Sequence, residues 1–359
     1  MRFLYRRIYL VGLGLAVVGG CAGGNQRIEL SGAAILAEPD PELNLSAYDA
    51  EELFHLAGEA ERTNDPNLAT AAYRRLLSDF PTSPLRWASL FNLGLLYEAA
   101  ERYGDAAPLY EEIATADTPT GDTQKRTWTD AHFRLAVCFG KLNRWWNAVA
   151  VFDYLLAESW MDGDDRLESL VGRAIALHEA GDAESAEVAY ATALRFFRDA
   201  QKEMPLYRTP VLAEAAFRMG DIAAERYHAV ALDFPIDLLR ERLTTKCEHL
   251  LTAQYRYLRA LRYGDAHTVA AAGYRIGELY ETLYDAVVGL RAPDDLTSEQ
   301  AEVYHEEVRE RVRVLVEKAL MAYEKGLFAG QRAPSAAAWT AKLEEASARL
   351  RSLYLAEEK

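Results

Sequence analysis

Cysteine, positive charge and long apolar runs are all scarce in this sequence. Only three of its 359 residues are cysteines, which excludes a fold held together by several disulfides. Cys138 and Cys247 stand more than a hundred residues apart, so two free thiols are expected, with a bridge between them as the alternative. The 40 basic residues are outnumbered by 55 acidic ones, a net charge of −15 that disfavours binding to nucleic acid or to anionic head groups.

Patterns that would indicate catalysis or a bound metal are also missing. None of the seven histidines lies in a metal-ligand spacing, and the acidic run Asp162–Asp165 lacks the glycine and glutamate of a calcium loop. The sequence therefore predicts no enzyme, no cofactor, no metal and no small-molecule substrate. The weakest alternative is an enzyme site formed by Glu278, Glu281 and His305, although no spacing links these three residues.

The N-terminus carries the first positive pattern. Three arginines precede an apolar stretch over residues 10–18 that is too short to span a bilayer, and Val18-Gly19-Gly20-Cys21 follows it. This run resembles the lipobox of bacterial lipoproteins. The resemblance implies that residues 1–20 are a signal peptide and that Cys21 is lipidated. The alternative is an ordinary cleaved signal peptide with a chance cysteine.

The same resemblance implies a location. Ala22 stands where an aspartate would favour retention in the inner membrane, so the expected site is the inner leaflet of the outer membrane, facing the periplasm. Residues 21–46, which include glycine, proline and polar residues, are expected to form a flexible tether. Because residues 1–20 contain three arginines and no acid, the remaining chain would carry a net charge of −18. Membrane contact is then expected through the lipid alone.

A repeated helical pattern begins near residue 48 and indicates an all-α chain. Each unit has a small residue in a first helix and, 12 positions later, an alanine followed by an aromatic residue in a second helix. The four units in phase pair Ala57 with Ala69, Gly94 with Ala106, Ala136 with Ala148, and Ala174 with Ala186. Two stretched units follow, with separations of 33 and 42 residues, from Gly220 to Ala253 and from Gly277 to Ala319.

These units define the expected organisation. Four regular hairpins are predicted over 47–200, two elongated ones over 201–330, and a capping helix over 331–359. Thr297 and Gln300 form a capping box that opens a helix reaching to about Leu327. The extra residues of the stretched units are expected to lengthen the helices.

The spacing of small and aromatic residues resembles the tetratricopeptide repeat (TPR). That resemblance covers about residues 48–355 and implies a right-handed solenoid of about six hairpins. The run Tyr274–Tyr280 and the stretch Glu302–Leu327 are similar to TPR proteins of myxobacteria, including envelope proteins of the gliding-motility machinery.

In such a stack the first helices line the concave face, so residues flanking the small position are expected to form an apolar, aromatic-lined groove that becomes acidic at Asp221 and Glu278. The alternative is that superhelical curvature buries these side chains. The predicted groove residues are Phe54, Phe91, Leu95, Phe133, Val137, Val171, Ile175, Phe217 and Tyr274. A second exposed patch is predicted from Trp146, Trp160 and Met161, with simple packing onto their own hairpin as the alternative.

These expectations describe a lipid-anchored periplasmic scaffold that binds other envelope proteins. The processes considered are outer-membrane assembly, pilus or secretion, and gliding motility. The alternative is an accessory regulator of peptidoglycan enzymes.

Overall fold

The computed structural model describes residues 45–116, 119, 121–202, 209–264, 266–293 and 296–357. Within these ranges the chain forms helices and no strand, which confirms the prediction of an all-α fold. The described residues divide into an N-terminal unit that ends at Asp182 and a C-terminal unit that begins at Ala183. Cys21, the predicted signal peptide and nearly all of the predicted tether lie outside the described residues.

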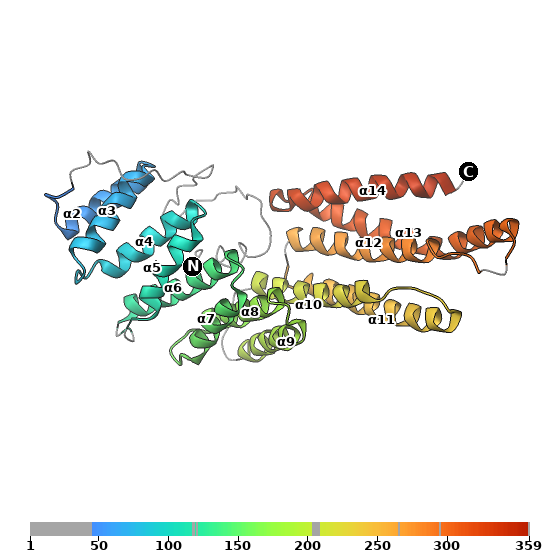
Figure 1. Cartoon of the computed structure of the whole chain (residues 1–359), viewed down its shortest axis with the longest axis horizontal. Helices are drawn as coiled ribbons and strands as arrows, with labels where there is room; N and C mark the ends of the chain where they lie inside the picture. Colours follow the sequence, from blue (N-terminus) through green and yellow to red (C-terminus); the bar gives the residue numbers. More distant parts are fainter. Residues whose placement is uncertain are drawn as a thin grey trace. The chain divides into compact units, whose positions relative to one another are not determined.

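The N-terminal unit consists of helices that pack in sequence order, each against the next along the chain (Figure 1). Its helices are α2 (Ala50–Arg62), α3 (Pro66–Asp79), α4 (Arg86–Ala99), α5 (Tyr103–Ala114), α6 (Asp122–Lys141), α7 (Trp145–Ala157) and α8 (Gly163–Glu179).

Local chemistry explains where these helices begin and how they turn. Asp49 caps α2 and forms a capping box with Glu52. The turns that follow α2, α4, α6 and α8 each contain one residue with positive φ, two positions before the next helix begins. These residues are Asn64 (φ 60°), Glu101 (57°), Asn143 (56°) and Gly181 (88°). A left-handed residue at this point ends the first helix and reverses the chain.

The C-terminal unit contains much longer helices, as the stretched repeats predicted. They are α9 (Ala183–Ala200), α10 (Thr209–Ala229), α11 (Ile236–Ala260), α12 (Ala266–Val288), α13 (Ser298–Gly330) and α14 (Ala337–Glu357), with a short 3-10 turn, η1 (Pro334–Ala336), before α14. Helices α12 and α13 pack along one another, as do α10 and α11 (Figure 1). Thr297 caps α13 through the predicted capping box with Gln300.

The boundary between the units falls between α8 and α9, which were predicted to form the fourth regular hairpin. Helix α9 belongs to the C-terminal unit, where it packs against α10. The carboxylate of Glu187 on α9 accepts hydrogen bonds from Arg226 of α10, at 2.6 Å, and from Arg256 of α11. These ion pairs join α9 to the long hairpin that follows it.

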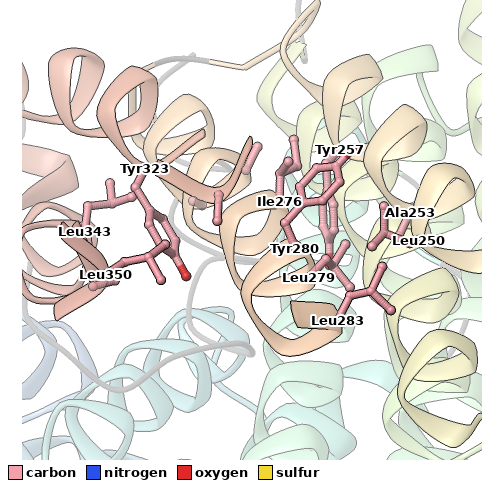
Figure 2. Close-up of a cluster of buried hydrophobic side chains, with 14 of the residues drawn as sticks. Leu250, Ala253, Tyr257, Ile276, Leu279, Tyr280, Leu283, Tyr323, Leu343 and Leu350 are labelled. Carbon is pink, nitrogen blue, oxygen red and sulfur yellow. The ribbon is translucent and has the colours of Figure 1, made fainter. Parts of the chain in front are cut away.

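Buried tyrosine, leucine and alanine side chains form the core of the C-terminal unit (Figure 2). Helix α14 packs on α12 and α13, as the predicted capping helix would. Its buried stripe consists of Trp339, Leu343, Ala346 and Leu350. Leu353, three residues after Leu350, is 38% exposed and does not continue that stripe.

Candidate functional site

An aromatic residue on the first helix of most hairpins packs against an aromatic residue on the second. In the N-terminal unit the pairs meet edge-on, with ring centroids 5.6–6.1 Å apart, a favourable arrangement for aromatic rings. The pairs are Phe54 with Tyr73, Phe91 with Tyr110, Phe133 with Phe152, and, in the C-terminal unit, Phe217 with Tyr257 and Tyr274 with Tyr323.

Where the small residue three positions after the first-helix aromatic is glycine, the second-helix ring occupies the space that a side chain would need. At Gly94, an added Cβ would lie 2.5 Å from a carbon of the Tyr110 ring, and at Gly220 it would lie 2.5 Å from the Tyr257 ring. The ring of Tyr323 approaches Gly277 in the same way. The recurring glycine therefore gives the second-helix ring room to pack against the first helix.

A hydrogen bond between the two helices of a hairpin, which was not predicted from the sequence, recurs in four hairpins. The hydroxyls of four buried second-helix tyrosines each donate to a carboxylate on the first helix, over 2.6–2.7 Å. Burial is the main cause that raises the pKa of all four tyrosines, which therefore stay protonated as donors. The pairs are Tyr73 with Glu61, Tyr110 with Glu98, Tyr257 with Asp221, and Tyr323 with Glu281.

The sequence contains a signal for this bond. Glu61, Glu98 and Glu281 each stand four residues after the small residue of their unit. In the third hairpin that position is Gly140, and the second-helix ring is Phe152, which has no hydroxyl to donate. The Trp145 ring packs over Gly140, where an added Cβ would lie 2.7 Å from it.

Glu98 also joins two hairpins. Its second carboxylate oxygen lies 3.2 Å from Nη1 of Arg134 on α6, and the two side chains are only 8% and 4% exposed. One carboxylate thus binds the Tyr110 hydroxyl within its hairpin and the Arg134 guanidinium of the next. A buried charge needs such partners because water cannot solvate it.

The predicted groove residues of the N-terminal unit fall into two groups. Phe54, Phe91 and Leu95 are half-buried, so part of each is accessible on α2 and α4. The remaining four are at most 5% exposed and serve as packing residues: Phe133, Val137, Val171 and Ile175. A continuous groove over four hairpins is therefore reduced to the surface of the first two.

In the C-terminal unit, Phe217 and Tyr274 are half-buried. The expected acidic surface at Asp221 and Glu278 is neutralised by Arg275, whose nitrogens lie 3.7 Å and 3.0 Å from the two carboxylates. Burial raises the pKa of Asp221, although Arg275 and the Tyr257 hydroxyl act in the opposite direction. Asp221 thus links α10 to Tyr257 of α11 and to Arg275 of α12, whereas Glu278 pairs with Arg275 within α12.

Paired antiparallel helices, a glycine beneath three of the second-helix rings and the same aromatic contact in five hairpins define the architecture. The fold is of the tetratricopeptide-repeat type. No protein-family profile matches the chain, and no curated protein matches it.

Solved structures show only a distant likeness to the chain. It is similar to a tetratricopeptide repeat protein from Parabacteroides merdae, with 14% identity, 82% of this chain and 98% of that one covered, and a TM-score of 0.39. It is also similar to a TPR repeats protein from Bacteroides fragilis, with 10% identity, coverage of 85% and 99%, and a TM-score of 0.30. Because the identities and TM-scores are low, the TPR fold type rests on the hairpin contacts described above.

The predicted patch on the third TPR hairpin is smaller than expected. Trp146 is 59% exposed, whereas Trp160 is half-buried and Met161 is buried. The Trp160 ring packs edge-on against buried Trp128, with centroids 5.5 Å apart. Only Trp146 of the three therefore presents a large exposed surface.

A buried histidine close to this patch was not singled out by the sequence. The ring of His132 stacks on Tyr154 at 5.5 Å, and its Nδ1 hydrogen-bonds the Trp128 carbonyl over 2.9 Å. Burial lowers the pKa of His132 to about 4, so the ring is neutral near pH 7. A neutral ring donates through Nδ1, as the Trp128 carbonyl requires.

The thiols of the described residues do not form a bridge. Cys138 and Cys247 are free, as expected, with Cys138 buried and Cys247 half-buried. Among the described residues no cluster of side chains could hold a metal ion. In the same part of the chain, no helix has the length and apolarity needed to cross a membrane.

Proposed function

We propose that this protein is a lipid-anchored adaptor of the bacterial envelope that binds other envelope proteins without catalysing a reaction. The half-exposed surface of Phe54, Phe91 and Leu95 on the first helices of two successive hairpins is the observation that carries the proposal. The run Val18–Cys21, with its likeness to a lipobox, supports the anchor and the periplasmic location.

The rigidity of this surface favours binding. The rings of Phe54 and Phe91 are already held edge-on by Tyr73 and Tyr110, so they lose little conformational freedom when a partner covers them. Apolar anchors on two successive hairpins suit an amphipathic helix or an extended peptide that carries its own apolar side chains. Binding would then proceed by burial of apolar surface.

A pair of substitutions tests the binding surface. Leu95→Asp places a charge among the apolar anchors without touching the aromatic pairs, and Phe91→Ala removes one anchor. Both variants should lose partners that wild type retains in affinity purification from solubilised envelopes followed by mass spectrometry. Leu251→Asp, which places the same charge on an exposed leucine of α11, is the matched control and should retain them. Recovery of every partner by Leu95→Asp would show that binding occurs elsewhere.

The anchor is tested separately. In cell fractionation, Cys21→Ser should move the protein from the membrane to the soluble periplasmic fraction, because the thiol that would carry the lipid is gone. Persistent membrane association would place the anchor elsewhere. The partners recovered by wild type then distinguish an assembly, pilus, secretion or motility complex from enzymes of wall synthesis.

A further inference from the structure

Helix α13 carries an exposed apolar stripe opposite the face that it buries. Its buried residues are Val316, Ala319, Tyr323, Gly326 and Gly330. At intervals of seven residues on the other side, Val314, Met321 and Phe328 are 48%, 53% and 59% exposed. A spacing of seven residues keeps side chains nearly in line along a helix, as in helices that pair along their length.

Two rows of opposite charge run beside this stripe. On one side, three and four positions from the apolar residues, lie the exposed carboxylates of Glu310, Glu317 and Glu324. On the other side lie the exposed cations of Arg311, Lys318 and Lys325, and Arg332 follows just beyond the end of the helix.

Most of these exposed charges also have partners within the chain. Arg311 lies 3.3 Å from Glu307, Glu310 lies 4.0 Å from Arg313, the Lys318 ammonium lies over the Tyr280 ring, and Glu317 is engaged as well. Glu324 lies 2.7 Å from Arg351 of α14, and the Arg332 guanidinium lies over the Phe328 ring at 3.7 Å. Exposed pairs of this kind are weak, so they can exchange for partners on another chain.

When two copies of α13 pair through their apolar stripes, their charge rows attract each other in only one relative orientation. When two α13 helices lie parallel about a two-fold axis along their length, the acidic row of each copy faces the basic row of the other. When they lie antiparallel, acid faces acid and base faces base, which is repulsive. The charges therefore select both the partner and its direction.

We infer that α13 is a homodimerisation helix, and that a second copy of this chain packs parallel to it along Val314, Met321 and Phe328. The two copies bury the apolar stripe against itself, while Glu317 and Glu324 meet Lys318 and Lys325 of the second copy. This pairing uses the C-terminal unit and is independent of the binding surface proposed on α2 and α4.

Cysteine cross-linking tests both pairing and direction. The full chain is produced with Cys138→Ala and Cys247→Ser, and Val314→Cys or Phe328→Cys is added singly before mild oxidation in isolated membranes. In the parallel dimer each position meets its own copy, so each variant should give a band at twice the chain mass. Leu251→Cys, at an exposed leucine of α11, is the matched control and should remain single.

Other outcomes overturn the inference. Absence of self-linking at both α13 positions excludes the pairing. Linking of Val314→Cys to Phe328→Cys only when the two variants are produced together indicates antiparallel helices. Linking to a band that contains a different protein identifies another occupant of the stripe.

Charge variants test the selection mechanism. The double variant Lys318→Glu, Lys325→Glu has acidic residues on both sides of the apolar stripe. The double variant Glu317→Lys, Glu324→Lys has basic residues on both sides. Each double variant alone should lose self-linking at Val314→Cys, and co-production should restore a mixed dimer. Unchanged linking in either double variant alone overturns the role of the charge rows.

Discussion

The buried pair of Glu98 and Arg134 offers the sharpest test of how these hairpins are joined. We predict that Arg134→Leu destabilises the N-terminal unit severely. The substitution leaves the Glu98 carboxylate, whose side chain is 8% exposed, with the Tyr110 hydroxyl as its remaining partner at this site. Removing one member of a buried ion pair typically costs about 3–5 kcal/mol in the free energy of unfolding. Tyr110→Phe alone should cost about 1.5–3 kcal/mol, the usual value for a hydrogen bond to a charged group.

The third hairpin suggests how the loss can be repaired. There, Gly140 and Phe152 replace the glutamate and tyrosine, and no charge remains to be satisfied. A triple variant, Glu98→Leu with Arg134→Leu and Tyr110→Phe, should therefore cost far less than its three single substitutions together. Replacing a whole buried ionic group by apolar side chains is often nearly neutral, so we expect about 0–2 kcal/mol.

Urea unfolding followed by tryptophan fluorescence measures these costs. Five of the six tryptophans lie in the N-terminal unit, so the signal reports mainly on that unit. Arg173→Leu is the matched control, because Arg173 of α8 lies 2.5 Å from Asp153 of α7 but is 32% exposed, and its partner is 53% exposed. The control should cost under about 1 kcal/mol. If Arg134→Leu costs no more than the control, the buried pair does not hold the hairpins together.

Three further predictions concern single positions. In urea unfolding, Gly94→Ala should destabilise the N-terminal unit by about 1–3 kcal/mol, because the added methyl group meets the Tyr110 ring. Gly58→Ala should be neutral or slightly stabilising, because nothing lies within 4 Å of the added methyl group. Equal effects of the two substitutions would contradict the role given to Gly94. Burial lowers the pKa of His132 from 6.5 to about 4, so folding favours the neutral ring. In unfolding titrations, the free energy of unfolding should therefore have its full value above pH 6.5 and fall by about 3 kcal/mol as the pH is lowered to 4. His132→Gln should remove that dependence and exposed His55→Gln should not; a decline that survives His132→Gln refutes the assignment. Thr297→Ala should lower the stability of the C-terminal unit by about 0.5–2 kcal/mol in thermal unfolding, and an unchanged midpoint would show that the α13 cap contributes nothing.

Much of the fold was predictable because its signals are local. Caps such as Thr297, turns such as Gly181 and the spacing of small and aromatic residues act within one helix or one hairpin. The lengthening of α10 to α13 followed from the wider spacing alone. The hydrogen bond from Tyr110 to Glu98 was also within reach, since the glutamate recurs at a constant distance from the small residue.

The candidate site was harder to predict, because exposure depends on the neighbouring hairpin. Phe91 and Phe133 occupy equivalent positions in their repeats, yet Phe91 is half-buried and Phe133 is only 1% exposed. A repeat pattern says where a side chain lies on its own hairpin and says nothing about what covers it. Trp160 and Met161 were misjudged for the same reason, because contacts such as that of Trp160 with Trp128 join residues far apart in the chain.

The sequence by itself determined the helices, their pairing into hairpins and the positions where a ring meets a glycine, since these depend on residues close together along the chain. Only the tertiary structure decided which aromatic side chains remain accessible, that Arg134 and Glu98 share a buried charge, and that the stripe of α13 is left uncovered. Those properties depend on which surfaces neighbouring helices remove from water, and that is settled by packing between segments distant in the sequence.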